Sequence, residues 1–339
     1  MASALTNLHP GAGRAPGSVD LPVARDSMGI PVVWGTMVKG ALKSAVAIKR
    51  GCLAGVSRGD REEHIVKCDG EARCKSICCL LGGEPGAGSA GASAVSIQDL
   101  YPLLIPAPAY VLASNGSKAP CNLGGVVYVT TKTLLARALA YAEASGNRLA
   151  DTLKEAVPEG GGGAAGGIVY CGGYTGSVKL VLAGSVLEAT AKPPTAELGG
   201  LDDKLGLGDL NPLYKVYPVH ERLLILDDEI GRSVINRLLV RVSRVALDRE
   251  TKTVRGGHLW TEEYLPWGTL FLGLAFETGY RNDYCEASTA GEFDPLKSLE
   301  ELLGEIGRML SIGGKESVGA GLLKIRALAS GGGQGDDKP

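Results

Sequence analysis

Apolar residues recur with the period of an α-helix in three segments, at residues 35–50, 131–144 and 293–310. The third segment also carries a start signal, because Asp294 is a natural N-cap and Pro295 a natural first helical residue. In the first segment, the residues expected to face inward are Met37, Val38, Ala41, Leu42 and Ala45. The pattern therefore predicts three amphipathic helices.

Other segments carry the β-branched or alternating apolar residues that are typical of strands. They lie at residues 95–107, 124–131, 176–191, 221–228, 237–248, 269–278 and 322–329. The predicted strands and helices mix irregularly rather than alternating strictly. The sequence therefore favours an α+β fold over a doubly wound parallel sheet.

One long hairpin is predicted at about residues 239–267. The run VRVSRVALDRETKTVRGGHLWTEEYLP indicates two strands that are closed by the polar turn DRETKT. Long polar hairpins often project from a sheet and contact a partner, whereas an ordinary edge hairpin is the other interpretation.

Length and composition bound the class of protein. A chain of 339 residues accommodates one large domain with insertions or two smaller domains. No run of about 18 apolar residues occurs, so no transmembrane helix is expected. The N-terminus lacks the pattern of a signal peptide, and we expect a cytoplasmic protein without a membrane partner. The net charge is −2, but residues 1–80 hold 11 Lys and Arg against 7 Asp and Glu. An excess of positive charge in this N-terminal part suits the binding of an anion. An ordinary fluctuation of charge along the chain is the alternative.

Glycine-rich stretches at 82–93, 160–167 and 330–339 punctuate the chain. The first two indicate flexible insertions or linkers, and the last predicts a disordered tail. GAGSAG at 86–91 has the letters of a dinucleotide fingerprint but lacks the preceding strand and following helix, so we reject it. No phosphate-binding GxxxxGK[ST] motif, HExxH motif or serine nucleophile elbow occurs, and these classes of enzyme are unsupported.

The cysteines cluster near residue 70, where Cys68, Cys74, Cys78 and Cys79 lie close to His64. These residues could ligate zinc, but their spacings are not the paired CxxC of strong zinc sites. Buried helix cysteines, or a disulfide of the kind found in hyperthermophile cytoplasm, are the competing interpretations.

Two loops combine glycine with lysine. Lys39 and Lys43 lie on one face of the first predicted helix, behind the loop GIPVVWGT, where amide groups and positive charge suit a phosphate. Near the C-terminus, Gly313 and Gly314 allow close backbone approach while Lys315 adds charge. Each site alone is explained by solvated lysines, but the two together favour a polyanionic ligand.

Four segments, LHPGAG…GSVDLPVARD, GIPVVWGTMVKGALKS, GGHLWTEEYLP and SIGGKESVGAGLLKI, occur in this order between residues 8 and 325. Together they resemble the RAMP superfamily of CRISPR-associated proteins, and specifically the backbone subunits of type III-B (Cmr) effector complexes. The VKGALKS helix and the C-terminal glycine-rich motif mark the superfamily, and VDLPVARD and LWTEEYLP select this subunit. Residues 50–95 have no match in the pattern.

The resemblance implies a fold and a set of partners. The fold is one domain over residues 1–329, with a ferredoxin-like core related to the RNA-recognition motif, an insertion at about 50–95 and a projecting β-hairpin thumb at about 239–267. The implied partners are a guide crRNA, a target RNA, other copies of the chain and other Cmr subunits. The implied activity is cleavage of target RNA at regular intervals along a filament, in antiviral defence.

The resemblance also carries roles onto individual residues. Asp20 falls at the position of the cleavage aspartate, and the nearby active-site positions fall on His9, Glu262 and Tyr264. Contacts with RNA are implied for Arg25, Lys39, Lys43, Gly313, Gly314 and Lys315.

The chemistry agrees with this reading, because RNA supplies its own 2′-hydroxyl nucleophile and cleavage mainly needs in-line geometry at one phosphate. One carboxylate then positions a divalent ion, Mg²⁺ or Mn²⁺, or helps to remove the hydroxyl proton. A non-catalytic crRNA-binding scaffold, a type III-A backbone subunit and a guide-processing endonuclease are the alternatives.

Overall fold

The computed structural model describes residues 1–14, 17–58, 61–83, 91–112, 121, 123–156, 166–280, 282–286 and 293–328, with the backbone alone at 58, 61 and 255–257. The chain divides into two compact units. The first contains residues 1–32, 101–272 and 313–339, and the second contains residues 33–100 and 273–312. The tail predicted at 330–339 lies outside the described residues.

The strands of the first unit are β1 (Ala2–Ala4), β5 (Tyr101–Val111), β6 (Gly125–Thr131), β7 (Gly167–Tyr170), β8 (Gly176–Leu182), β9 (Ser185–Lys192), β10 (Leu223–Leu226), β11 (Val240–Leu247), β12 (Val254–Tyr264), β13 (Leu270–Leu272) and β16 (Leu322–Ile325). Its helices are α3 (Lys132–Ala144), α4 (Leu149–Ala156), α5 (Ala196–Gly199), α6 (Leu201–Lys204), α7 (Leu207–Leu210), α8 (Leu213–Val216), α9 (Asp228–Leu238) and the 3₁₀ turns η1 (Val219–Glu221) and η2 (Glu316–Val318).

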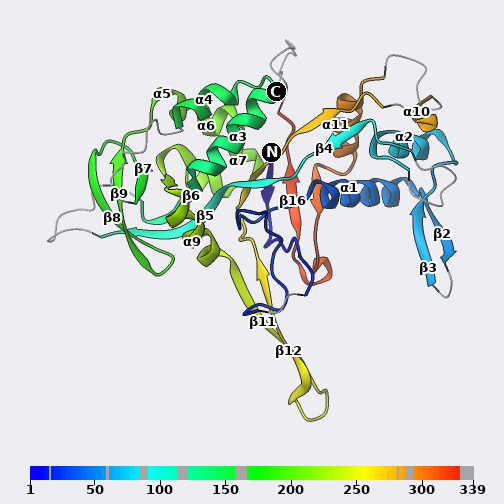
Figure 1. Cartoon of the computed structure of the whole chain (residues 1–339), viewed down its shortest axis with the longest axis horizontal. Helices are drawn as coiled ribbons and strands as arrows, with labels where there is room; N and C mark the ends of the chain where they lie inside the picture. Colours follow the sequence, from blue (N-terminus) through cyan, green and yellow to red (C-terminus); the bar gives the residue numbers. More distant parts are fainter. Residues whose placement is uncertain are drawn as a thin grey trace. The chain divides into compact units, whose positions relative to one another are not determined.

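One sheet organises the first unit, with strand order β16-β1-β13-β5-β6-β10-β7-β9-β8. Strand β5 also pairs with β8, through Ala109 opposite Leu182 and Val111 opposite Leu180. Six strands, from β5 round to β8, therefore close into a barrel-like ring (Figure 1). Closure of the ring leaves no free edge between these strands.

Alternate residues of the central strands enter two different hydrophobic cores. On β10, Leu224 and Leu226 pack in the core formed by the ring strands and α9, whereas Leu223 and Ile225 pack in the core that includes α3 and α4. Successive side chains of a strand point to opposite faces, so burial on both faces explains the unbroken apolar run LLIL.

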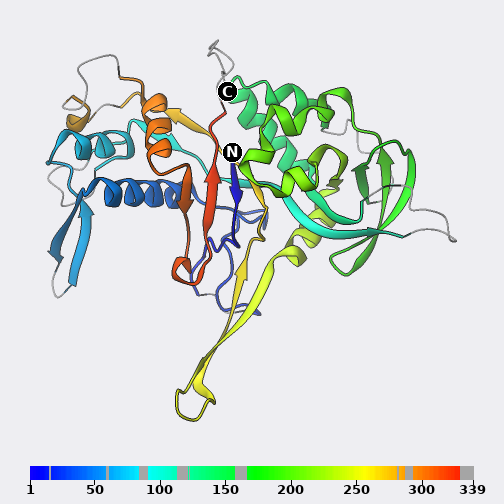
Figure 2. The same ribbon diagram turned by 180° about the vertical axis from the view of Figure 1, so that it is seen from behind.

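Strands β11 and β12 form the hairpin that the sequence predicts at about 239–267. They pair antiparallel from Val240 opposite Tyr264 to Val245 opposite Leu259, and an irregularity follows before Leu247 pairs with Val254. The hairpin extends away from its neighbours in two opposite views (Figures 1 and 2). The base of the hairpin, from Thr261 to Leu265, forms hydrogen bonds with the loops that carry Leu8 and Asp20.

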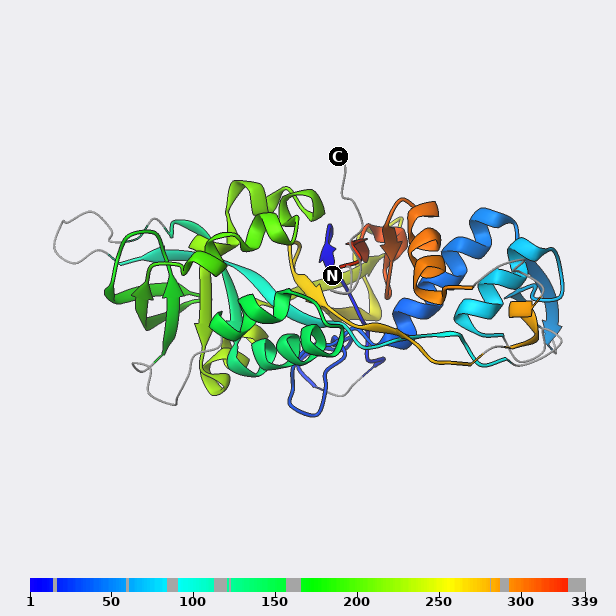
Figure 3. The same ribbon diagram turned by 90° about the horizontal axis from the view of Figure 1, so that it is seen from above.

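The elements of the second unit are α1 (Gly35–Arg50), β2 (Leu53–Arg58), β3 (Arg61–Val66), α2 (Ala72–Leu81), β4 (Val95–Ile97), β14 (Ala275–Glu277), α10 (Asp283–Glu286), α11 (Pro295–Glu305) and β15 (Met309–Ser311). Helices α1, α2 and α11 pack against one another (Figure 3). Strand β2 pairs with β3, and β4 pairs with β14. The predicted insertion at 50–95 lies within this unit.

Cysteines pair as disulfides in the second unit, which is one of the alternatives that the sequence leaves open. Helix α2 contributes three half-cystines, and the bonds are Cys52–Cys74, Cys68–Cys78 and Cys79–Cys285. A disulfide sulfur is not a thiolate, so Cys68, Cys74 and Cys78 offer no zinc ligand in this oxidised state. A fourth disulfide, Cys121–Cys171, lies in the first unit.

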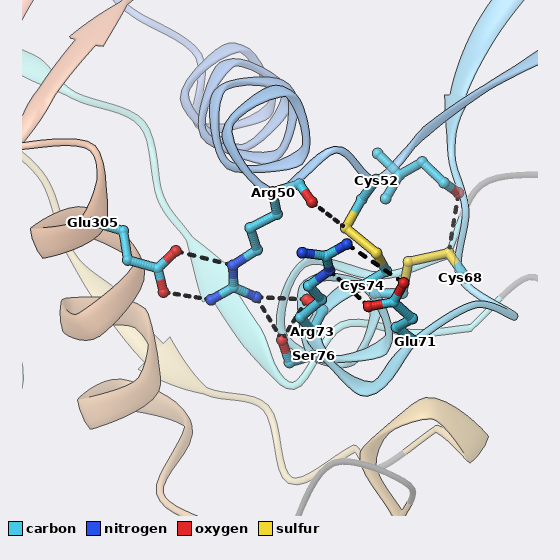
Figure 4. Close-up of a disulfide and its surroundings, with 10 residues drawn as sticks. Arg50, Cys52, Cys68, Glu71, Arg73, Cys74, Ser76 and Glu305 are labelled. Carbon is cyan, nitrogen blue, oxygen red and sulfur yellow. Dashed lines mark hydrogen bonds and ion pairs between the residues drawn. A yellow bond between two sulfur atoms is a disulfide. The ribbon is translucent and has the colours of Figure 1, made fainter.

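Arg50 fastens the C-terminal end of α1 beside these disulfides (Figure 4). Its Nε donates to the Glu305 carboxylate at 2.9 Å, and its Nη1 donates to the Arg73 carbonyl at 2.6 Å and to Ser76 Oγ at 2.8 Å. One guanidinium therefore joins α1, α2 and α11.

The mixed α and β content is confirmed, and so is the predicted start of α11, where the Asp294 side chain accepts hydrogen bonds from the amides of Leu296 and Lys297. The helix predicted over 293–310 is too long, because the chain turns through positive φ at Gly307 and Arg308 and then forms β15. The run at 176–191 is two strands, since Ala183 and Gly184 form a turn. Within the described part of the chain, no helix is both long and apolar enough to cross a membrane.

Candidate functional site

Asp20 lies on an exposed loop and is held by a threonine of the hairpin. Asp20 Oδ2 accepts hydrogen bonds from the Thr261 amide at 2.8 Å and from Thr261 Oγ1 at 3.0 Å. In return, the Asp20 amide donates to Thr261 Oγ1 at 3.0 Å. The hydrogen bonds from Thr261 lower the pKa of Asp20 below its ordinary value. An exposed, ionised carboxylate with a fixed orientation is the result.

Glu262 is a buried carboxylate with four hydrogen-bond donors. It accepts from Lys315 Nζ and Trp260 Nε1, both at 2.7 Å, from Arg244 Nε at 3.2 Å, and from the Tyr264 hydroxyl. Burial raises the pKa of Glu262, but the four donors outweigh it and lower the pKa to about 2. Glu262 is therefore ionised at neutral pH, and its oxygens are already occupied by donors.

Glu263 holds a second set of donors. Its carboxylate accepts from Arg25 Nη2 at 2.7 Å, from Arg241 Nη2 at 3.0 Å and from the Val23 amide at 3.3 Å. Arg25 also donates to Asn236 Oδ1 from Nε at 3.3 Å. The guanidinium of Arg25, for which the sequence predicts a contact with RNA, thus fastens the loop after Asp20 to the hairpin base.

His9 is 5% exposed and lies beside the same strand. Its Nδ1 donates to the Glu263 carbonyl at 2.7 Å, because a carbonyl only accepts, and its ring centroid lies 5.4 Å from that of Tyr264. The amide of Gly314 donates to the His9 carbonyl at 3.1 Å. The histidine therefore links the hairpin base to the glycine-rich loop.

The glycine-rich loop requires glycine at residue 313. Gly313 has φ +87°, and a Cβ added there would lie 2.2 Å from the His9 carbonyl oxygen. Two residues later, Lys315 adopts φ 72° and directs its Nζ towards Glu262, 5.7 Å from the centroid of the Trp260 ring. The sequence predicts that the backbone of this loop approaches another group closely, and in the structure that group is the backbone of His9.

Lys39 and Lys43 belong to α1 of the second unit, whereas the residues described above belong to the first unit. Lys39 Nζ donates to Ser93 Oγ at 2.7 Å, and burial together with the charge of Lys43 lowers the pKa of Lys39. Lys43 is only 8% exposed, which is less than expected for a solvated lysine.

The described residues contain no group of three or more His, Cys, Asp and Glu side chains that could hold a metal ion. Glu262 and Glu263 are committed to lysine and arginine, which leaves Asp20 as the accessible carboxylate of the cluster. A single carboxylate can hold Mg²⁺ when phosphate groups of the substrate and water molecules supply most of the other ligands.

Sequence reasoning missed three residues that the cluster depends on: Thr261, Glu263 and Arg244. The alternation of side chains along a strand could have identified residues of this cluster from the sequence. It places Thr261 and Glu263 on one face of β12, with Glu262 and Tyr264 on the other, and cross-strand pairing then places Arg241 opposite Glu263.

Comparison with known protein families gives one match that covers nearly all of the chain. The model of the RAMP superfamily matches residues 2–324. The chain is 27% identical over 334 residues to the CRISPR system Cmr endoribonuclease Cmr4 of Pyrococcus furiosus, which is 95% of this chain and 92% of that protein. It is 39% identical over 106 residues to the CMR subunit Cmr4 of Saccharolobus solfataricus, which covers 31% of this chain.

Solved structures share the fold. The chain resembles a chain of the type III-B Cmr-beta complex bound to cognate target RNA, with a TM-score of 0.66, 23% identity and coverage of 96% of this chain and 94% of that one. It also resembles oligomeric Cmr4 from Pyrococcus furiosus, with a TM-score of 0.54, 21% identity and coverage of 95% and 94%.

Proposed function

This chain belongs to the RAMP superfamily, and we propose that it is the backbone subunit of a type III-B CRISPR effector complex that cleaves target RNA. Its curated relatives are named as Cmr4 proteins, and one of them as an endoribonuclease. The partners in this proposal are a guide crRNA, a complementary target RNA, further copies of the chain and other Cmr subunits.

Asp20 is the observation that carries the proposal. Its carboxylate is exposed and ionised, and it is fixed at the base of a long hairpin by Thr261. In the proposed reaction Asp20 accepts the proton of the 2′-hydroxyl, the 2′-oxygen attacks the adjacent phosphorus, and the bond from phosphorus to the 5′-oxygen breaks as that oxygen takes a proton from water. The products are a 2′,3′-cyclic phosphate and a 5′-hydroxyl end.

A divalent ion fits this proposal as an accessory to Asp20. It would be held by the Asp20 carboxylate together with phosphate oxygens of the RNA, and it would neutralise charge on the reacting phosphate. The residues of the chain supply the orientation: Thr261 fixes the carboxylate, and Arg25 and Glu263 fix the loop that carries it.

The hairpin β11–β12 acts as a thumb in this proposal. Displacement of one nucleotide by the hairpin would distort the RNA backbone beside Asp20 towards in-line geometry. Lys39, Lys43 and the loop Gly313–Lys315 would contact the guide backbone, so that base pairing with the guide alone selects the sequence.

The proposed core of the first unit is ferredoxin-like. The strand order β5-β6-β10-β7 supports this, because the central strands β6 and β10 are parallel and each outer strand is antiparallel to its neighbour. Helices α3 and α9 follow the two central strands, as in a split βαβ arrangement.

The test is cleavage of a labelled, guide-complementary RNA by the reconstituted complex that contains the Asp20→Asn chain. We expect a loss of about 10²–10⁴-fold in the rate of forming evenly spaced products, with assembly and target binding unchanged. Asp209→Asn is the matched control, since Asp209 is another exposed carboxylate of the first unit, where it pairs with Lys215. Wild-type cutting by the Asp20→Asn complex would instead support the non-catalytic scaffold.

A further inference from the structure

We infer that Thr261 is a positioning residue for cleavage: it holds the Asp20 carboxylate through Oδ2 and leaves Oδ1 directed to the RNA. This inference rests on the proposed function, in which Asp20 takes the proton from the attacking hydroxyl.

The contact is reciprocal and therefore specific for both residues. Thr261 donates twice to Oδ2, from its amide at 2.8 Å and from Oγ1 at 3.0 Å, and it accepts from the Asp20 amide at 3.0 Å. The hydroxyl both donates and accepts here, which a valine of the same shape cannot do. Both hydrogen bonds that Thr261 donates to the carboxylate fall on Oδ2.

The rest of the strand register supports the same contact. The Leu21 amide donates to the Thr261 carbonyl at 3.0 Å, and the Glu263 amide donates to the Leu21 carbonyl at 3.0 Å. Residues 20–23 thus run along β12, and Glu263 fixes their far end through Arg25 and the Val23 amide. Thr261 is the residue of this register that reaches the carboxylate itself.

The charge of Asp20 depends on the same hydrogen bonds. Donation from Thr261 is the main cause of its lowered pKa, and Arg14 is the charged group that adds to it among the described residues. Loss of the threonine hydroxyl raises the pKa of Asp20 only towards its ordinary value of 3.8. The carboxylate therefore stays ionised at neutral pH, and the loss of Thr261 acts through the orientation of the carboxylate.

The test compares complexes that contain Thr261→Val, Thr261→Ser and the wild-type chain in the same cleavage assay at neutral pH. For Thr261→Val we expect a loss of about tenfold in the cleavage rate, the cost of one hydrogen bond to a charged group. Thr261→Ser keeps the hydroxyl and restores the rate. Thr190→Val, which removes a strand hydroxyl from β9, is the control for general strand effects.

A second variant avoids any change in the hairpin. Asp20→Glu keeps the charge but moves the carboxylate by one methylene from Thr261, and we expect it to cleave at least tenfold more slowly than wild type. Wild-type cleavage rates for both Thr261→Val and Asp20→Glu would overturn the inference. Failure of the proposed function is distinguishable, because only then does the Asp20→Asn complex also cut at the wild-type rate.

Discussion

Glu262 and Glu263 are consecutive residues of β12, yet their carboxylates bind different cations on opposite faces of the hairpin. Glu262 binds Arg244 and Lys315, whereas Glu263 binds Arg25 and Arg241. The alternation of a strand produces this division. One face of the hairpin base thereby holds the glycine-rich loop, and the other holds the loop that carries Asp20.

Replacement of Glu262 by glutamine is expected to change how stability depends on pH. The pKa of Glu262 is lowered to about 2 in the folded chain, so its contribution is present above the unfolded value of 4.5 and is lost as pH falls towards 2. A shift of this size corresponds to roughly 3 kcal/mol. Urea unfolding of the wild-type and Glu262→Gln chains at pH 7 and pH 4 measures it, and the difference between them should be smaller at pH 4. A constant difference would contradict the prediction.

Replacement of Glu263 by alanine should destabilise the first unit by about 1–3 kcal/mol, because the partly exposed Arg25 and Arg241 lose their buried anionic partner. Chemical denaturation of the isolated chain measures the change in the free energy of unfolding. Glu188→Ala on β9 is the control, since Glu188 is exposed and its carboxylate accepts from Ser177. Equal, small effects of the two substitutions would show that the Glu263 pairs contribute little.

Replacement of Gly313 by alanine should cost about 1–3 kcal/mol from strain at positive φ, in addition to the clash with the His9 carbonyl oxygen. Gly304→Ala on α11 is the matched control, because a Cβ there meets open space and alanine favours the helix by about 0.5–1 kcal/mol. The midpoints of thermal unfolding should therefore move in opposite directions. A Gly313→Ala chain as stable as wild type would disprove the close contact.

Reduction should loosen the second unit around α2. Among the described strands, β2 and β3 pair only with each other, and such two-stranded sheets are marginal without other support. The three disulfides on α2 supply that support, at about 2–5 kcal/mol for each native bond. Limited proteolysis with and without reductant, mapped by mass spectrometry, should show new cleavage within residues 52–81. The Cys121→Ser/Cys171→Ser chain serves as the control, because it should leave those sites protected under oxidising conditions.

Chelation of divalent ions should stop cleavage and leave target binding intact. The expectation follows from Asp20 being the accessible carboxylate of the cluster, so that an ion is held jointly with the RNA. EDTA treatment followed by Mg²⁺ or Mn²⁺ addition measures it in the cleavage assay. Full activity in EDTA would show that Asp20 acts without a metal.

The sequence by itself determined those features that depend on residues close together in the chain. Periodicity located α1, α3 and the start of α11, and the polar turn between two alternating runs located the β11–β12 hairpin. These helices and the hairpin are local in origin, and short-range propensity and capping suffice to specify them. Asp20, His9, Glu262, Tyr264 and Lys315 became candidate site residues through the resemblance of their motifs to the RAMP superfamily.

Only the tertiary structure decided what these residues contact. Closure of the ring by β5 and β8, the three disulfides on α2, and the pairing of Asp20 with Thr261 join residues from 10 to 241 positions apart. Such contacts depend on register and packing, which no local pattern encodes. The same dependence explains why Lys39 and Lys43 joined the second unit, while Lys315 came to lie against Glu262.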